Sequence, residues 1–129
     1  MPWLLDTHTL LWFVDEAPQL PLNVRELIEG SKDVCVSIAS FWEMAIKSSK
    51  GKLSLTCSII QMMGICIDTL KFPILHIKGV HLEMLRTLPW IHKDPFDRLL
   101  IAQAMSEEMV LVTADEHIAK YPVHRMWAV

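Results

Sequence analysis

Apolar runs and helically spaced apolar positions alternate along this chain, and each pattern predicts a different element. Short runs that are apolar or β-branched predict strands, at 2–6, 33–38, 72–77, 109–115 and 123–129. Helical spacing predicts helices over 7–16, 21–31, 39 to about 50, 56–70, 78–89 and 95–108, with a helical turn at 117–121. Pro73 places its strand at a sheet edge, because proline cannot donate a ladder hydrogen bond.

The order of these elements predicts the fold class. Strands alternate with helices, and several strands are apolar throughout, which is typical of an α/β fold with a parallel sheet covered by helices on both faces. The 129 residues are 52% hydrophobic and 21% charged, which suits one soluble domain over 1–129. We expect most of the five tryptophans and the apolar, Met-rich stretch 59–67 to be core, although that stretch equally suits an interface.

Charge and cysteine content narrow the function classes. The net charge of −3 excludes a general basic coat for nucleic acid, so a phosphate-bearing substrate needs a local basic rim or bound cations. Cys35, Cys57 and Cys66 lack metal-site spacing and predict free thiols, the first and last buried, in a reducing cytoplasm. The N-terminal apolar run is broken by Asp6, and no run approaches the ~20 residues of a membrane span, so neither a signal peptide nor membrane association is expected.

Acidic residues fall where predicted strands end or helices begin, and they are the candidate chemistry. Asp6 ends the first strand and Asp115 follows the strand at 109–113, so a parallel sheet brings both to one rim. Asp94 and Asp97 begin the helix that leads into that strand, which puts them on the same side of the sheet.

A fifth candidate, Glu43, borders the apolar arc of its helix, where a surface ion pair with Lys47 is an equal alternative. Helix capping is the alternative for the aspartates. Asp94 suits an N-cap, Pro95 the first helical position and Asp97 the acid of a capping box. Capping and metal binding stay open together, because a first-turn aspartate can do either.

Converging carboxylates repel one another and tend to protonate unless a cation neutralises them. Oxygen ligands with no cysteine and few nearby histidines favour Mg²⁺ or Mn²⁺, which can activate water for phosphoryl displacement. The six histidines have no zinc-site spacing. His8 and His92 lie near the acids, and we expect them to be solvated surface side chains.

Four stretches carry a resemblance to a known family, in family order and over almost the whole chain: LLDTHTLLWF, VSIASFWEMAIKSSKGKL, HKDPFDRLLIAQA and LVTADEHIAKY. With them the sequence resembles the PIN domain family, and most closely the VapC-like toxin ribonucleases of prokaryotic toxin–antitoxin pairs. The resemblance implies a three-layer α/β/α fold and Mg²⁺- or Mn²⁺-dependent endoribonuclease activity on RNA. It also implies a homodimer that is inhibited by a cognate antitoxin.

By position, the resemblance assigns the four acids of the family to Asp6, Glu43, Asp97 and Asp115. Asp94 is an extra acid of the DPFDR pattern that can orient, cap or bind through water. Thr7, Thr113 and Ser40 neighbour the acids and are candidates to hold a carboxylate or a bound water, although ordinary local hydrogen bonding explains them equally well.

Basic and aromatic residues flank the expected rim. The basic candidates for RNA phosphates are Lys47, Lys93 and Arg98, with Lys50 and Lys52 nearby. Trp42 or Trp90 is a candidate to stack on a base. The alternative is a solvated charged face with core tryptophans.

Two other functions compete with a ribonuclease. A phosphatase of the haloacid-dehalogenase type also begins with a strand-end aspartate, but that class needs a second acid where His8 stands. A non-catalytic regulator derived from this fold binds only a protein partner, and the four matched acids argue against it.

Overall fold

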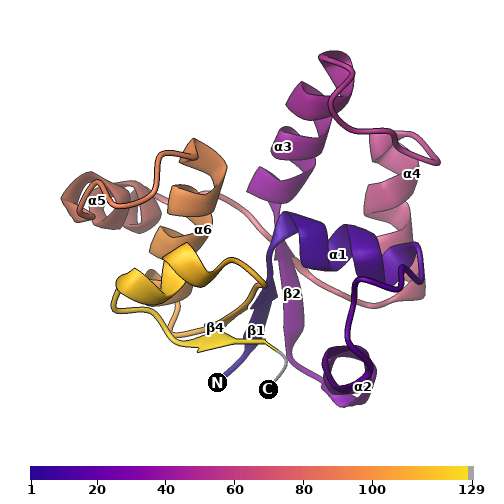
Figure 1. The fold of residues 1–129 in the computed structure, drawn as a ribbon, viewed down its shortest axis with the longest axis horizontal. Coiled ribbons are helices and arrows are strands. Elements are labelled where there is room, and N and C mark those ends of the chain that lie inside the picture. Colours follow the sequence, from indigo (N-terminus) through magenta and orange to yellow (C-terminus); the bar gives the residue numbers. More distant parts are fainter. Residues whose placement is uncertain (128–129) are drawn as a thin grey trace.

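The computed structural model describes residues 1–127 as one five-stranded sheet with helices on both of its faces (Figure 1). In chain order the elements are β1 (Trp3–Leu5), α1 (Thr7–Val14), α2 (Leu22–Gly30), β2 (Val34–Ser37), α3 (Ile38–Ser49), α4 (Ile59–Gly64), the π-helical turn η1 (Ile65–Thr69), β3 (Ile74–Leu75), α5 (Gly79–Thr87), α6 (Pro95–Ser106), β4 (Val110–Val112), the 3₁₀ turn η2 (Glu116–Lys120) and β5 (Arg125–Met126).

The strands run parallel in the order β3-β2-β1-β4-β5, so β1 is central. In the register of the sheet, Leu5 lies opposite both Val36 of β2 and Val112 of β4. The residues that follow Leu5 and Val112 therefore leave the sheet at the same edge, while β2 continues for one more residue to Ser37. The two residues that leave are Asp6 and Thr113, which sets the position of the site.

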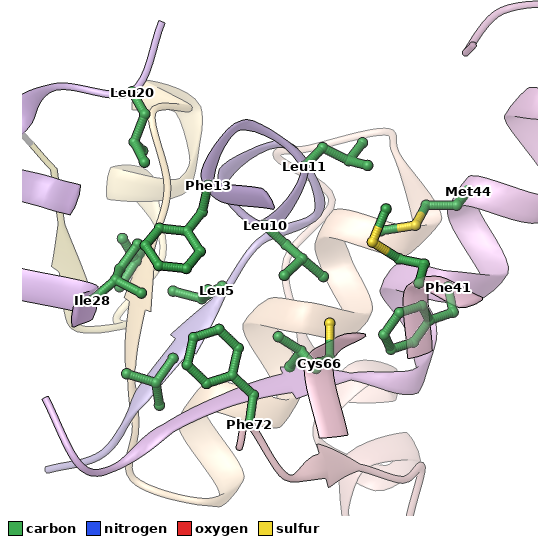
Figure 2. Packing of buried hydrophobic residues seen from close by; sticks show 14 of the residues in the cluster. Leu5, Leu10, Leu11, Phe13, Leu20, Ile28, Phe41, Met44, Cys66 and Phe72 are labelled. Atoms are coloured by element: carbon green, nitrogen blue, oxygen red, sulfur yellow. The ribbon is translucent and has the colours of Figure 1, made fainter. Parts of the chain in front are cut away.

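Strand residues alternate between two buried faces. Leu5, Val36 and Val112 belong to a core with α1, α2, α3 and α4 (Figure 2). Leu4 and Leu111 belong to a second core with α5 and α6, which lie on the opposite side of the sheet in Figure 1. Because both faces are buried, the central strands β1 and β4 are apolar throughout. The predicted parallel sheet and three-layer α/β/α architecture are confirmed.

The predicted helix at 56–70 begins later and changes its winding. Ser58 accepts a hydrogen bond from the Gln61 amide, and the Gln61 side chain accepts one from the Ser58 amide. This capping box starts α4 at Ile59. The last turn, η1, is π-helical.

The two edge strands are shorter than predicted. Of residues 72–77 only Ile74–Leu75 form a strand, β3. The predicted strand at 123–129 is reduced to Arg125–Met126, and residues 128–129 lie outside the described part.

The tryptophans are less buried than expected. Trp90 is 84% exposed and Trp42 is also exposed, whereas the other three are half-buried. The stretch 59–67 has both a core side, with Met62 and Cys66 buried, and an exposed side that carries Ile60 and Ile67.

The cysteines are free, and Cys35 and Cys66 are buried as predicted. Burial raises the pKa of each of these two thiols to about 11. Among residues 1–127, no helix combines the length and apolar character that a membrane crossing requires.

Candidate metal centre

Asp6 leaves the central strand and caps the helix that follows. Its Oδ1 accepts a hydrogen bond from the Thr9 amide at 2.8 Å, so the capping alternative is confirmed for Asp6. The side chain is only 6% exposed and is hydrogen-bonded by Thr113 from the end of β4. Burial outweighs these hydrogen bonds and raises the pKa of Asp6. A carboxylate that caps a helix is therefore also desolvated at the sheet edge.

Asp94 and Asp97 divide the roles at the start of α6. Asp94 is the N-cap, and its Oδ1 accepts from the amides of Phe96 at 2.8 Å and Asp97 at 3.1 Å. The capping box expected of Asp97 is wrong, because the Asp94 amide donates to His92 Nδ1 instead, at 3.1 Å. The side chain of Asp97 is therefore free of capping.

Asp97 lies where the acids converge. Burial, followed by the charges of Asp94 and Glu43 and more weakly of Asp6, raises its pKa to about 7, although His92 acts in the opposite direction. Carboxylates that follow β1, lie on α3 and begin α6 are therefore close enough to repel one another electrostatically. We call the set of these carboxylates together with Asp115 the acid cluster.

Glu43 reaches the acid cluster from α3 and is buried, with 2% of the residue exposed. Its Oε1 accepts from the Thr7 hydroxyl at 2.6 Å, and its Oε2 accepts from Lys47. The Thr7 hydroxyl has one hydrogen and donates it to Glu43. The Ser40 hydroxyl, 3.0 Å from the Thr7 oxygen, must therefore donate to Thr7. The ion pair of Glu43 with Lys47, the alternative left open for Glu43, is present, but its acid is buried and not on the surface.

Asp115 follows β4 in the chain and joins the acid cluster as the N-cap of η2. Its Oδ1 accepts from the His117 amide at 2.9 Å, and its Oδ2 lies 2.7 Å from His92 Nε2. Its own amide donates to the Thr113 hydroxyl at 3.1 Å. Burial alone would raise the pKa of Asp115, but the hydrogen bonds from His92 and the His117 amide outweigh it, so the pKa is lowered.

His92 is the site residue that sequence reasoning misplaced. The prediction of a solvated histidine is wrong: the side chain is 15% exposed and its Nε2 lies between Asp115 Oδ2 and Asp97 Oδ2, the latter at 3.3 Å. The available signal was its position two residues before the N-cap Asp94, where a ring nitrogen can accept the N-cap amide. His8, in contrast, is exposed as expected.

The arrangement suits a divalent cation. One ligand atom each of His92, Asp97 and Asp115 lie within 4.8 Å of one another, and carboxylate oxygens dominate the surroundings. Among the described residues, the acid cluster has Lys47 as an ion-pair partner, bonded to Glu43 and 3.9 Å from Asp94 Oδ2. One lysine does not neutralise five carboxylates, and the neighbouring acids add to burial in raising the pKa of Asp97. A hard ion with oxygen ligands would relieve it.

Arg98 is a correction to the predicted phosphate contacts. Arg98 is 3% exposed, and its guanidinium donates to the Pro89 carbonyl at 2.8 Å and to the Tyr121 hydroxyl at 3.3 Å. It also lies 3.9 Å from the centre of the Trp90 ring. Arg98 thus fixes the segment between α5 and α6 and has no exposed face for RNA. Lys93, Lys50 and Lys52 are exposed.

Comparison with known proteins places this geometry in context. The PIN domain family model matches residues 3–123. Ribonuclease VapC22 of Mycobacterium tuberculosis (strain ATCC 25618 / H37Rv) is 23% identical over 124 residues, which cover 92% of this chain and 90% of that protein. VapBC2 from Rickettsia felis, bound to a DNA fragment from their promoter, contains a chain with a TM-score of 0.75 at 17% identity, covering 99% of this chain and 100% of that one. FitAcB from Neisseria gonorrhoeae gives 0.69 at 15% identity, with 96% of each chain covered. The solved structures share the fold.

The raised pKa of Asp97 predicts that the free energy of unfolding of the metal-free protein depends on pH. The folded carboxyl keeps its proton up to about pH 7, whereas the unfolded chain releases it near pH 4, so the folded state binds more protons in this window. Stability from this group therefore falls as pH rises from about 4 to 7. Asp97→Asn is expected to raise the free energy of unfolding by about 1–2 kcal/mol at pH 8 and by less at pH 5, measured by urea unfolding with EDTA present. An equal effect at both pH values would contradict this assignment.

The burial of Arg98 predicts a structural role. Arg98→Ala leaves the buried Leu88 carbonyl without its donor and the Pro89 carbonyl with the Tyr121 hydroxyl alone, so we expect a loss of about 2–4 kcal/mol in the free energy of unfolding. Lys93→Ala is the exposed control and should change stability by less than about 0.5 kcal/mol. Thermal and urea unfolding measure both, and equal stabilities of the two variants would refute the structural role.

Proposed function

The chain belongs to the PIN domain family, and from this we propose that it is a metal-dependent endoribonuclease, the toxin of a toxin–antitoxin pair. One observation carries the proposal: the acids that match the family by position converge on Asp97, at the carboxyl edge of the parallel sheet. This is the edge at which open α/β sheets bind ligands. The name of the relative Ribonuclease VapC22 agrees with the activity.

We propose Mg²⁺ or Mn²⁺ as the cofactor, held by Asp6, Glu43, Asp97 and Asp115. When bound, such an ion lowers the pKa of a water molecule and offsets the charge that develops on a phosphate. Asp94 contributes negative charge and caps the helix that presents Asp97. The expected products, with a 5′-phosphate and a 3′-hydroxyl, rest on the family resemblance.

The side chains around Glu43 prepare it for this role. Thr7 and Lys47 each bond one of its two oxygens, and Ser40 holds Thr7. Each carboxylate oxygen has a second lone pair, so a ligand position remains on each. Because Glu43 is buried, these contacts fix its rotamer before any ion or RNA binds. Lys47, predicted as a phosphate contact, thus acts first as a partner of the acid.

RNA would approach over the hollow beside the cluster that is lined by Ile91, His92, Lys93, Asp94 and His117. Lys93 is exposed there and can contact a phosphate. Trp90 presents one indole face to solvent, while Arg98 covers the other, which leaves a stacking surface for a base. With a net charge of −3, binding depends on these local contacts.

An antitoxin partner and a homodimer complete the proposal. They rest on the family resemblance, and the relatives of solved structure include VapBC2. An antitoxin segment that places an Arg or Lys among the acids would compete with both ion and RNA. A small reading frame just upstream of this gene, encoding a DNA-binding protein that co-purifies with the chain, is the direct check.

Removing a single proposed ligand should abolish cleavage. Asp6→Asn keeps the helix cap, because asparagine caps as well as aspartate, but loses charge at the site. We expect Asp6→Asn and Asp97→Asn to lower RNA cleavage at least about 100-fold with Mg²⁺ or Mn²⁺ present. Asp68→Asn, an exposed acid on η1, is the control and should cleave like the wild type.

Undiminished cleavage by Asp6→Asn and Asp97→Asn would refute the site. Titration calorimetry of the wild type with Mn²⁺ separates the remaining alternative. If no divalent ion binds and no RNA is cut, the result favours a non-catalytic, protein-binding regulator.

RNA affinity should depend on the segment before α6. Trp90→Ala is expected to weaken binding of single-stranded RNA by about 5- to 50-fold, and Lys93→Ala by less and mainly at low salt. Fluorescence anisotropy with labelled RNA and Ca²⁺ in place of Mg²⁺ measures both variants. Lys32→Ala, on the exposed segment before β2, serves as the control. Unchanged affinity in Trp90→Ala would remove this surface from the RNA path.

A further inference from the structure

His92 has a defined hydrogen position, because of what surrounds its two ring nitrogens. The Asp94 backbone amide donates to His92 Nδ1 at 3.1 Å. A backbone amide can only donate, so Nδ1 carries no hydrogen. In a neutral imidazole the hydrogen must then be on Nε2. A doubly protonated ring would lose the bond to the Asp94 amide.

The Nε2 hydrogen lies between two acids of the cluster. Asp115 Oδ2 is 2.7 Å from Nε2, and Asp97 Oδ2 is 3.3 Å away. Taken as atoms alone, these three groups resemble a three-ligand metal site within 4.8 Å. An imidazole nitrogen that bears a hydrogen has no lone pair to offer a metal, so the hydrogen bonds decide against that interpretation.

We propose that His92 is a positioning residue of the metal centre and not a ligand. As a neutral Nε2–H imidazole it donates to Asp115 Oδ2, lies 3.3 Å from Asp97 Oδ2, and so fixes the spacing of the two carboxylates. The proposal rests on the metal-dependent function proposed above. It extends that function by assigning a role to a side chain outside the four matched acids.

The support of His92 agrees with a positioning role. Its backbone amide donates to the Tyr121 hydroxyl at 2.8 Å, which itself donates to the Pro89 carbonyl at 2.9 Å. The ring is held by the Asp94 amide, and the His117 ring stands edge-on to it at 6.3 Å. The orientation of the imidazole is therefore set by the backbone at the start of α6, independently of an ion. Asp94 fixes the helix with its side chain and the imidazole with its main chain.

The tautomer can be tested directly. Long-range ¹H–¹⁵N correlation spectra of ¹⁵N-histidine protein report which ring nitrogen bears hydrogen, with His92→Gln identifying the signal. We expect the Nε2–H form of His92 without metal and unchanged on addition of Mg²⁺. With Mn²⁺, electron-spin-echo spectra of the same labelled protein should show no directly coordinated ¹⁵N. An Nδ1–H tautomer, or a coordinated histidine nitrogen, would overturn the proposal.

Ion affinity tests the positioning itself. His92→Ala should weaken Mn²⁺ binding about 10-fold by calorimetry, as removal of a group that orients metal ligands generally does. His92→Gln keeps an N–H donor and should stay within about 3-fold of the wild type. His124→Ala, an exposed histidine remote in sequence from the acids, is the control. An unchanged affinity in His92→Ala, or no recovery in His92→Gln, would count against positioning.

These results separate the two proposals. If the wild type binds no divalent ion, the proposed function fails, and the metal-free spectrum still decides the tautomer. If ions bind and RNA is cut but His92 is coordinated, only the inference on His92 fails.

Discussion

The site depends on carboxylates being held close together in a partly desolvated place. Three adjacent parallel strands end within one residue of one another, and the chain leaves them into segments that carry acids or their hydroxyl partners. The sheet provides the rigidity and the burial, and it leaves the acids little freedom to separate. Burial raises the pKa of Asp6, and burial together with the neighbouring carboxylates raises the pKa of Asp97. Wherever these groups are charged, their removal from water therefore costs stability.

Four of the five acids are restrained by hydrogen bonds from a neighbouring group. Amides at helix starts bind Asp6, Asp94 and Asp115, while a hydroxyl and a lysine bind Glu43. These contacts orient the oxygens without cancelling the charge. Capping, which the structure shows, and the proposed ligation are compatible roles for an aspartate. A capping aspartate has further lone pairs, and the cap itself supplies the orientation that a metal site requires.

Much of this arrangement could be predicted from sequence, because it depends on local patterns. Apolar runs that stop at an acid located β1, and the parallel topology brought Asp6 and Asp115 to one edge. The burial of Glu43 could not be predicted, since it depends on how α3 packs against Thr7. The role of Arg98 was also hidden, because only the path of the chain between α5 and α6 brings backbone carbonyls around a basic residue. His92 needed the same tertiary information.

The placement of the strands has a consequence for variation within such a chain. The acids and their hydroxyl partners are attached to the three middle strands, to α1 and α3, and to the start of α6, whereas β3 and β5 contribute only two residues each at the outer edges. Insertions or losses at those outer edges would leave the rim that carries the acids undisturbed. A lineage could therefore remodel its flanks to suit new binding partners while its chemistry stayed the same.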